Sequence, residues 1–346
     1  MRFLSKIPNC RYLCFPLFCL LLFPSAHMAD DSTKPSRFSV KKLSPSGMPY
    51  NDKGRFRSPF ANPAYGTPCN IKVGFMLKSV SGFSTKEGKF EADFYVSYTS
   101  DKPMPGEIKP HFTNGMVQDD DHIERIADEP TFKLWKFHAL FYTQADLRAY
   151  PFDTQELEIG MEEVDVGIDQ INFIADQDHI RLDSDFVMPG WEVSHIESRV
   201  LTHYYPDRFE YDDLYYPRFI FRLGIKRFAN SALFTVFLPA FVIVLVSLSG
   251  IWLSGKEIET RINSSAPMLA AAVLFHYTLS QEIPATAYLT RADKLMLGVY
   301  LGLITNLFAT WAFFFFDPKY EERIFKLGRW IVPPLNMILY TLGCII

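Results

Sequence analysis

The chain has 346 residues and a formal net charge of -4 at pH 7, from 35 Lys and Arg against 39 Asp and Glu. This balance, with no run of basic residues, argues against a nucleic-acid partner, because phosphate binding needs a cationic surface. Hydrophobic residues make up 48% of the chain, but a polar part extends to about Arg227 and a far less charged part follows it. Two main domains are therefore expected.

The N-terminal region reads as a signal peptide followed by a flexible leader. Residues 1–29 contain a basic start, an apolar stretch and a small-residue cleavage region, in that order. Residues 30–67 are rich in Pro, Ser, Lys and Gly and lack apolar periodicity. A cleaved signal would place the next domain outside the plasma membrane, or outside the inner membrane of a Gram-negative bacterium.

From Ile71 the pattern changes to β-strands. Phe90, Ala92 and Phe94 alternate with charged residues, which is the period of a half-buried sheet. Similar runs occur at 71–80, 132–141, 156–162, 171–176, 191–201 and 218–225. Many short strands without intervening helical patterns predict an extracellular antiparallel β-sandwich over residues 68–227. We find no nucleotide-binding loop, HExxH, CxxC or nucleophile motif, so an enzyme is not indicated.

Residues 228–346 are expected to form a four-helix transmembrane bundle. Three segments are strongly apolar, at 233–253, 295–316 and 330–346. The fourth, 261–284, is long enough to cross a hydrocarbon core of about 30 Å, but it carries polar side chains that are costly in lipid. We expect the apolar segments to shield it, so that it lines an aqueous path.

One motif in the sandwich region points to a family. The run Tyr150-Pro151-Phe152-Asp153-Thr154-Gln155 resembles the signature loop of the pentameric ligand-gated ion channels, the Cys-loop receptor superfamily. Two cysteines close this loop in eukaryotic members, whereas Thr143 and Leu157 occupy those positions here. The chain therefore resembles the mostly bacterial branch that lacks the loop disulfide.

Further motifs follow in the family's order, and the resemblance covers the chain from about Ile71. A strand ends at Arg227, Pro239 lies in the first span, and Pro284 begins the linker between the second and third spans. Ala287 stands where many relatives have a second proline.

The resemblance implies a homopentameric channel in the lipid bilayer. In the family, a small ligand or ion binds between subunits in the outer domain, and the signature loop then acts on the linker between spans two and three. The residues that this implies for coupling are Glu87, Pro151, Asp153, Arg227 and Pro284. Arg227 would pair with Asp153, with Glu87 as a candidate third member. The alternative is that Arg227 simply anchors the chain at the membrane interface.

The pore face is chosen by counting back from Pro284 in alternate steps of three and four. This gives Gln281, Tyr277, Leu274, Ala270, Pro267 and Asn263, with Glu259 at the cytoplasmic mouth. Five copies of Glu259 would form an acidic ring that favours monovalent cations, although the neighbouring Arg261 argues against this. The alternative is that both are ordinary solvated residues at the helix end. A rotated face is a rival, made of Met268, Ala271, Phe275, Thr278 and Glu282.

Three details of this helix stay open. Pro267 could kink the helix or mark its first turn after a cap at Ser264 or Ser265. Ala270 takes a place often held by a bulky gate, which leaves Leu274 and Tyr277 as substitutes. His276 lies off the preferred face, where it could sense pH or form hydrogen bonds between helices.

The ligand-binding residues follow from the resemblance. Aromatic faces attract organic cations and acidic groups strengthen that attraction. The candidates are Phe94, Glu162, Glu163, Tyr204, Tyr205, Phe209 and Tyr211. The family's Trp near Glu163 is missing, and the same aromatic residues could instead pack a hairpin. The ligand stays open among an amine, a proton and a divalent ion.

Two acidic segments could bind calcium through hard oxygen ligands, Asp119-Asp120-Asp121-His122 and residues 176–185, or could simply be solvated. We expect no cofactor beyond such calcium modulation. Two other functions remain open. One is a non-conducting membrane receptor or ligand-binding accessory subunit, and the other is a membrane-anchored binding protein of another class.

Overall fold

The computed structural model describes residues 68–117, 122–163, 165–168, 170–205, 214–254 and 256–345. All of them belong to one of the two units into which the chain divides, Phe56–Ile346. The expected signal peptide and leader lie outside the described residues.

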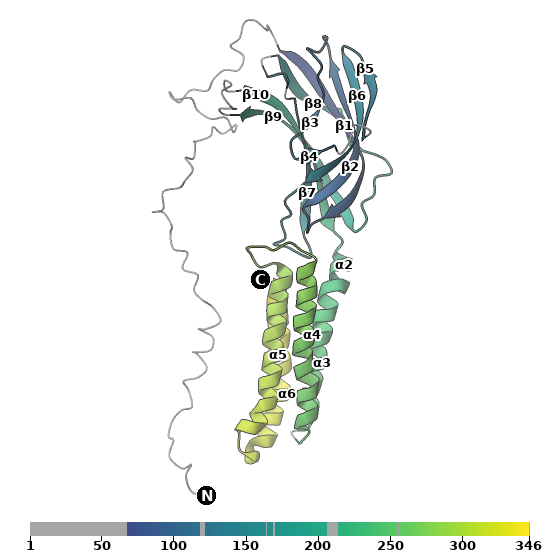
Figure 1. Ribbon diagram of the computed structural model, residues 1–346. Helices are drawn as coiled ribbons and strands as arrows, with labels where there is room; N and C mark the ends of the chain where they lie inside the picture. The colour runs from purple at the N-terminus through teal and green to yellow at the C-terminus, as the bar shows by residue number, and fades with distance from the viewer. Residues whose placement is uncertain are drawn as a thin grey trace, which may run out of the picture. The chain divides into compact units, whose positions relative to one another are not determined.

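Within the described residues, ten strands form two sheets (Figure 1). The larger sheet has the order β4-β6-β2-β1-β8, with β5 also pairing with β6, and the smaller has the order β3-β7-β10-β9. The strands are β1 (Cys69–Ser84), β2 (Lys89–Ser100), β3 (His111–Phe112), β4 (Gly115–Met116), β5 (Ile123–Asp128), β6 (Phe132–Tyr142), β7 (Thr154–Glu162), β8 (Ile171–Leu182), β9 (Trp191–Tyr205) and β10 (Leu214–Arg227). Every run predicted as a strand lies in one of them.

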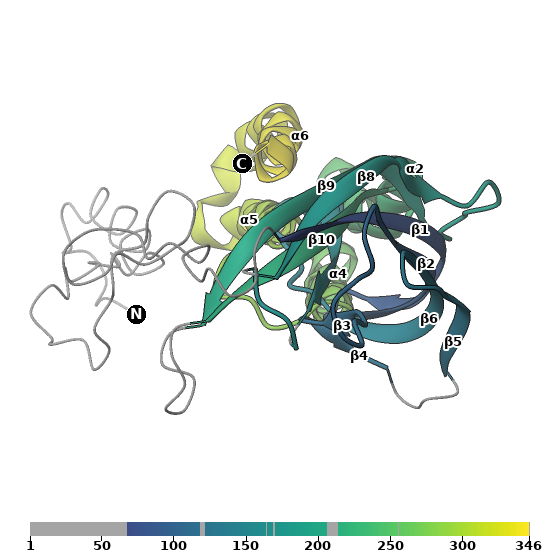
Figure 2. The ribbon, with the colours of Figure 1, turned by 90° about the horizontal axis from the view of Figure 1, so that it is seen from above.

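The sandwich departs from the expected antiparallel arrangement at one place. β1 and β8 pair in parallel, with Cys69 opposite Ile171, whereas the other paired strands run antiparallel. β8 follows β7, which belongs to the other sheet, so the chain crosses between sheets before β8 instead of turning back in a hairpin. Such a crossover allows parallel pairing. Figure 2 shows β9 and β10 side by side, with β2, β6 and β5 in the other sheet.

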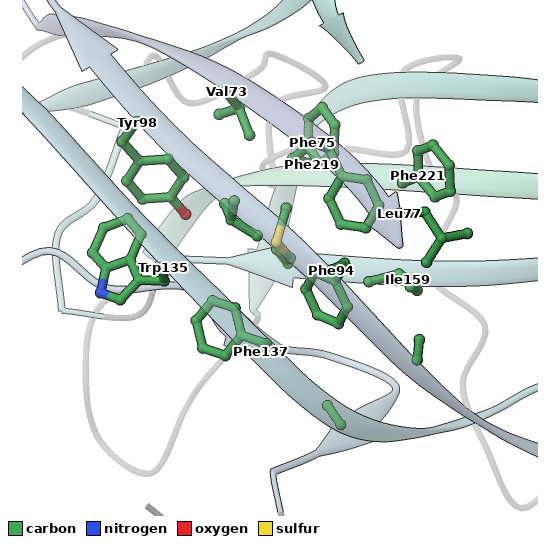
Figure 3. Close-up of a cluster of buried hydrophobic side chains, with 14 of the residues drawn as sticks. Val73, Phe75, Leu77, Phe94, Tyr98, Trp135, Phe137, Ile159, Phe219 and Phe221 are labelled. Carbon is green, nitrogen blue, oxygen red and sulfur yellow. The ribbon is translucent and has the colours of Figure 1, made fainter. Parts of the chain in front are cut away.

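Aromatic side chains fill the space between the two sheets. The ring of Phe75 in β1 stacks on Phe94 in β2 and on Phe221 in β10, with centroid distances of 5.1 and 4.3 Å. Figure 3 shows Phe75, Phe94 and Phe219 among the buried side chains of this core. Full burial of one such side chain stabilises a fold by about 1.5–3 kcal/mol, so these rings fix how the sheets face each other.

The helical part begins directly after β10. A continuous helical segment consists of α2 (Ala229–Ala232), a π-helical turn (Leu233–Phe237), α3 (Leu238–Ser249) and a 3-10 turn (Gly250–Trp252). The π-helical turn comes just before Pro239, which cannot donate a backbone hydrogen bond and so disturbs the regular helical ladder.

Three long helices follow: α4 (Ile258–Gln281), α5 (Arg291–Phe315) and α6 (Glu321–Ile345). α4 runs through Pro267, so the alternative of a helix that starts after Ser264 or Ser265 is wrong. Within the described chain, two helical segments are long and apolar enough to cross a membrane, Ala229–Trp252 and Arg291–Phe315. α4 and α6 carry more polar and charged side chains.

The helices pack through a shared apolar core and a buried polar network. The core includes Val244 of α3, Ala272 of α4 and Leu295 of α5. Asn306 of α5 donates to the hydroxyl of Ser247 in α3 at 2.9 Å, and Asn336 of α6 donates to Asn306 at 2.8 Å. Hydrogen bonds of this kind hold helices together where water is excluded.

Candidate functional site

The predicted ion pair between Asp153 and Arg227 is present at the end of the sandwich. Arg227 Nε donates to Asp153 Oδ1 at 2.8 Å, and Gln155 Nε2 donates to Oδ2 at 2.6 Å. The backbone nitrogen of Arg227 also donates to the backbone oxygen of Asp153, at 3.1 Å. Asp153 is fully buried. Both of its carboxylate oxygens therefore have partners, as a buried charge requires.

Arg227 also makes cation-π contacts with two aromatic rings. Its guanidinium lies over the ring of Trp191 at 4.3 Å and over Tyr150 at 5.3 Å. These cation-π contacts and the ion pair turn the side chain toward the signature loop, which disfavours a simple role as an interfacial anchor. Glu87, the candidate third member, pairs instead with Lys89 at 2.6 Å on the surface. The expectation for Glu87 is therefore wrong in this structure.

The signature-loop motif and the residues just before it contact the linker between α4 and α5 and the start of α5. The backbone nitrogen of Leu147 donates to the hydroxyl of Tyr288, in the linker, at 3.0 Å. The backbone nitrogen of Ala292, in the first turn of α5, donates to the backbone oxygen of Tyr150 at 3.1 Å. Within the loop, the Tyr150-Pro151 peptide is cis and Pro151 is buried. The linker also contains Pro284, which is half-buried. This is the neighbourhood that the coupling prediction requires.

Two side chains of the sandwich reach the C-terminal end of α4. Lys86, in the turn between β1 and β2, donates from Nζ to the backbone oxygen of Gln281 at 2.8 Å. The hydroxyl of Tyr150 donates to Glu282 Oε2 at 3.3 Å. Burial, followed by the charge of Glu282, raises the pKa of Tyr150 to about 12, so this hydroxyl stays a donor at neutral pH. No pattern in the sequence marked Lys86, Glu282 or Tyr288 as contact residues.

The predicted pore face of α4 is uncovered in the single chain. Leu274 and Tyr277 are 67% and 63% exposed. The other predicted members are exposed too: Glu259, Asn263, Pro267, Ala270 and Gln281. On the rival face, Met268 and Phe275 pack against the helical core and Ala271 is half-buried, although Thr278 and Glu282 are exposed. The structure thus leaves the preferred face free for other contacts.

Arg261 points away from this face. It is 2% exposed, donates from Nη1 to the backbone oxygen of Leu253 at 3.0 Å and lies over the ring of Phe313 at 4.6 Å. Two positions along a helix turn a side chain by about 200°, which separates Arg261 from the exposed Glu259. Arg261 therefore does not neutralise Glu259 within one chain.

His276 links α4 to α5. Its Nδ1 lies 3.1 Å from the hydroxyl of Tyr300, and its Nε2 lies 3.0 Å from Asp293 Oδ1. Asp293 also closes a capping box with Thr290 at the start of α5. The alternative of a histidine hydrogen-bonded between helices is confirmed.

Three of the predicted ligand-binding residues have described side chains, and all three are buried. Phe94 is fully buried in the core between the sheets, so its expected place in an exposed aromatic box is wrong. Glu162, on β7, is 1% exposed and pairs with Arg218 at 2.6 Å. Glu163 is fully buried and accepts from the backbone nitrogen of Lys109 at 3.1 Å.

The side chains of the remaining ligand candidates are not among those that the structure describes. Tyr204 and Tyr205 end β9, with side chains outside the described part, and Phe209 and Tyr211 lie outside the described residues. Asp119, Asp120 and Asp121 lie outside it as well. No group of three or more His, Cys, Asp or Glu that could hold a metal ion occurs among the residues that the structure describes.

Comparison with known proteins gives a distant relative. No protein-family model matches the chain. Over 168 residues, the chain is 25% identical to a protein described as a proton-gated ion channel from Gloeobacter violaceus (strain ATCC 29082 / PCC 7421). The match covers 49% of this chain and 45% of that protein, so the chain spans about half the length of the curated relative it matches. This similarity suggests a relationship to the ligand-gated channels that the sequence motifs resemble.

Proposed function

We propose that the protein is a ligand-gated ion channel formed by five copies of the chain. The observation that carries the proposal is that the sandwich, through Lys86 and Tyr150, contacts the end of the half-polar helix α4, whose other face is uncovered. A movement of the sandwich would therefore act directly on α4. In this proposal residues 1–29 are a signal peptide, 30–67 a leader, 68–227 the outer domain and 228–346 the membrane domain.

In the proposed pentamer, the uncovered faces of five α4 helices line the pore. This would give the polar and half-exposed residues of α4 an aqueous environment, which lipid cannot provide. Glu259 would form a ring at the cytoplasmic mouth and favour monovalent cations, and Arg261 does not oppose it because its guanidinium lies on Phe313. Leu274 and Tyr277, the most exposed large side chains on this face, would form the gate.

The relative is proton-gated, so the proton is the first ligand to test. His276 joins α4 to α5 through Asp293 and Tyr300, so a change at this residue would act on the helix proposed to line the pore.

The test is current through the purified full chain in planar bilayers, recorded while pH and a panel of amines and divalent ions are varied. We expect ligand-evoked current that reverses near the cation equilibrium potential. Glu259→Gln should reduce cation selectivity, whereas Glu257→Gln, an exposed acid two residues earlier, should change it far less. Pentameric protein that stays silent under every condition would instead favour the non-conducting receptor. A monomer would favour the anchored binding protein.

A further inference from the structure

A polar row crosses the outer face of the larger sheet. Ser79 in β1 lies opposite Asp93 in β2, and Asp93 lies opposite His138 in β6. The Ser79 hydroxyl donates to Asp93 Oδ2 at 2.7 Å, and His138 Nδ1 lies 2.8 Å from Asp93 Oδ1. Side chains directly opposite on one face of paired strands are close neighbours, so the register itself builds this row.

Asp93 fixes the orientation of the His138 ring. The Ser79 hydroxyl occupies Oδ2 of Asp93, and Oδ1 faces Nδ1 of His138. When the neutral His138 ring donates from Nδ1 to this carboxylate, its Nε2 carries a lone pair. The His138 side chain is 37% exposed. This arrangement of carboxylate and imidazole is the one that orients metal-binding histidines in many proteins.

A second imidazole lies beside the first. The ring centroids of His122 and His138 are 5.3 Å apart, with an angle of 31° between the ring planes. His122 directly precedes β5, whose Ile123 pairs with Phe137, the neighbour of His138. Nδ1 of His122 is buried and has no hydrogen-bond partner among the described residues. A buried ring nitrogen without a partner is costly unless a ligand supplies one.

We propose that His122 and His138 bind a divalent transition-metal ion such as Zn²⁺, with water completing the coordination and Asp93 as a positioning residue. Two imidazoles bound tetrahedrally at about 2.0–2.1 Å have ring centroids roughly 5 Å apart, close to the separation here. Imidazole nitrogens suit Zn²⁺, Cu²⁺ and Ni²⁺ and not Ca²⁺, which prefers oxygen. The site therefore differs in kind from the calcium binding considered for the acidic segments.

The charged groups around the two histidines are compatible with a bound cation. Lys136, two residues before His138 in β6, is held by Glu124 of β5 at 3.2 Å. Asp93 contributes a negative charge behind the His138 ring. Because His122 and His138 belong to different segments, a bound ion would tie the start of β5 to β6. The proposal stands independently of channel function.

The test is a calorimetric titration of the tag-free full chain, with ZnCl₂ and CaCl₂ as separate titrants. We expect one Zn²⁺ per chain, bound at least about tenfold more weakly in His122→Asn or His138→Asn. Asp93→Asn should weaken binding about 10–100-fold, because it removes only the orienting group. The matched control is His179→Asn, since His179 forms the same kind of pair with Asp176, at 2.8 Å.

A spectroscopic measurement separates binding from loss of fold. The electron paramagnetic resonance spectrum of bound Cu²⁺ should show coupling to two imidazole nitrogens in the native chain and in Asp93→Asn, but to one in His138→Asn. Zn²⁺ affinity that is unchanged in the double variant His122→Asn/His138→Asn would overturn the proposal. So would an equal loss in His179→Asn.

Discussion

The Nζ atom of Lys86 lies 2.8 Å from the backbone oxygen of Gln281, the last residue of α4. A cation at this position faces the negative end of the helix dipole and satisfies one of the carbonyls that the helix leaves unpaired. The bond joins residues 195 positions apart in the chain. The turn between β1 and β2 is therefore in direct contact with the helix that is proposed to line the pore.

Lys86→Met should therefore change gating without changing conduction. A cation at a helix C-terminus contributes about 0.3–1 kcal/mol, which corresponds to roughly a two- to fivefold shift in the ligand concentration for half-maximal current. Single-channel conductance should stay unchanged, because Lys86 does not lie on the proposed pore face. Lys89→Met is the control, since Lys89 pairs with Glu87. Equal shifts in both variants would refute a specific role of the contact with Gln281.

Breaking the Asp153-Arg227 pair should destabilise the protein strongly. Asp153 is fully buried, so Arg227→Gln leaves its charge without its main partner, at a cost of about 3–5 kcal/mol. The apparent Tm of the detergent-solubilised protein should fall in Arg227→Gln and recover in part in Asp153→Asn/Arg227→Gln. In contrast, Arg199→Gln removes an exposed pair with Glu197 and should cost less than about 1 kcal/mol. A double variant no more stable than Arg227→Gln would contradict this account.

Cysteine accessibility can test the face of α4. Ala270 is exposed and Ala272 is fully buried, although they are two residues apart. In the proposed channel, Ala270→Cys should react with a charged thiol reagent and lose current, whereas Ala272→Cys should not. The background should lack Cys69 and Cys344, which are the free cysteines of the described residues. The reverse pattern of reactivity would favour a rotated pore face.

Tyr150 should give the stability a distinct dependence on alkaline pH. Its pKa of about 12 in the folded state lies above its unfolded value of 10, so its contribution is fully present below pH 10 and is lost as the pH rises toward 12. Tyr150→Phe loses the hydrogen bond to Glu282, but its stability no longer depends on the ionisation of a hydroxyl at this position. We therefore expect the Tm difference between the native chain and Tyr150→Phe to shrink between pH 10 and pH 12. A constant difference over that range would show that Tyr150 is not protected from ionisation.

Several elements of the site could be predicted because short patterns determine them. The alternation of apolar residues located the strands. Counting in steps of three and four chose the face of α4 that is uncovered, because helical geometry fixes which positions share a face. These two inferences concern residues governed by one regular period. The pairing of Asp153 with Arg227, 74 positions apart, was instead implied by the resemblance to the channel family.

Other features could not be predicted from a local pattern, or were predicted against it. The alternation along β2 already indicated that Phe94 is buried, but the family resemblance placed this residue in a ligand site. α4 continues through Pro267, and its buried residues lie on both sides of the proline, with Arg261 and Ser265 before it and Ala272 and Leu279 after it. Lys86 and Gln281 are 195 positions apart in the chain, so their contact depends on the folding of the whole sandwich between them in sequence.

The network of Ser247, Asn306 and Asn336 has a consequence for motion. Sliding α6 along α5 by even one turn would separate two buried amides, and Gly302 leaves no space for a larger side chain beside Asn336. These hydrogen bonds therefore tie α3, α5 and α6 to one another. In the proposed channel, the three helices would form a frame against the surrounding lipid, and α4, which the sandwich contacts at one end, would be the moving part.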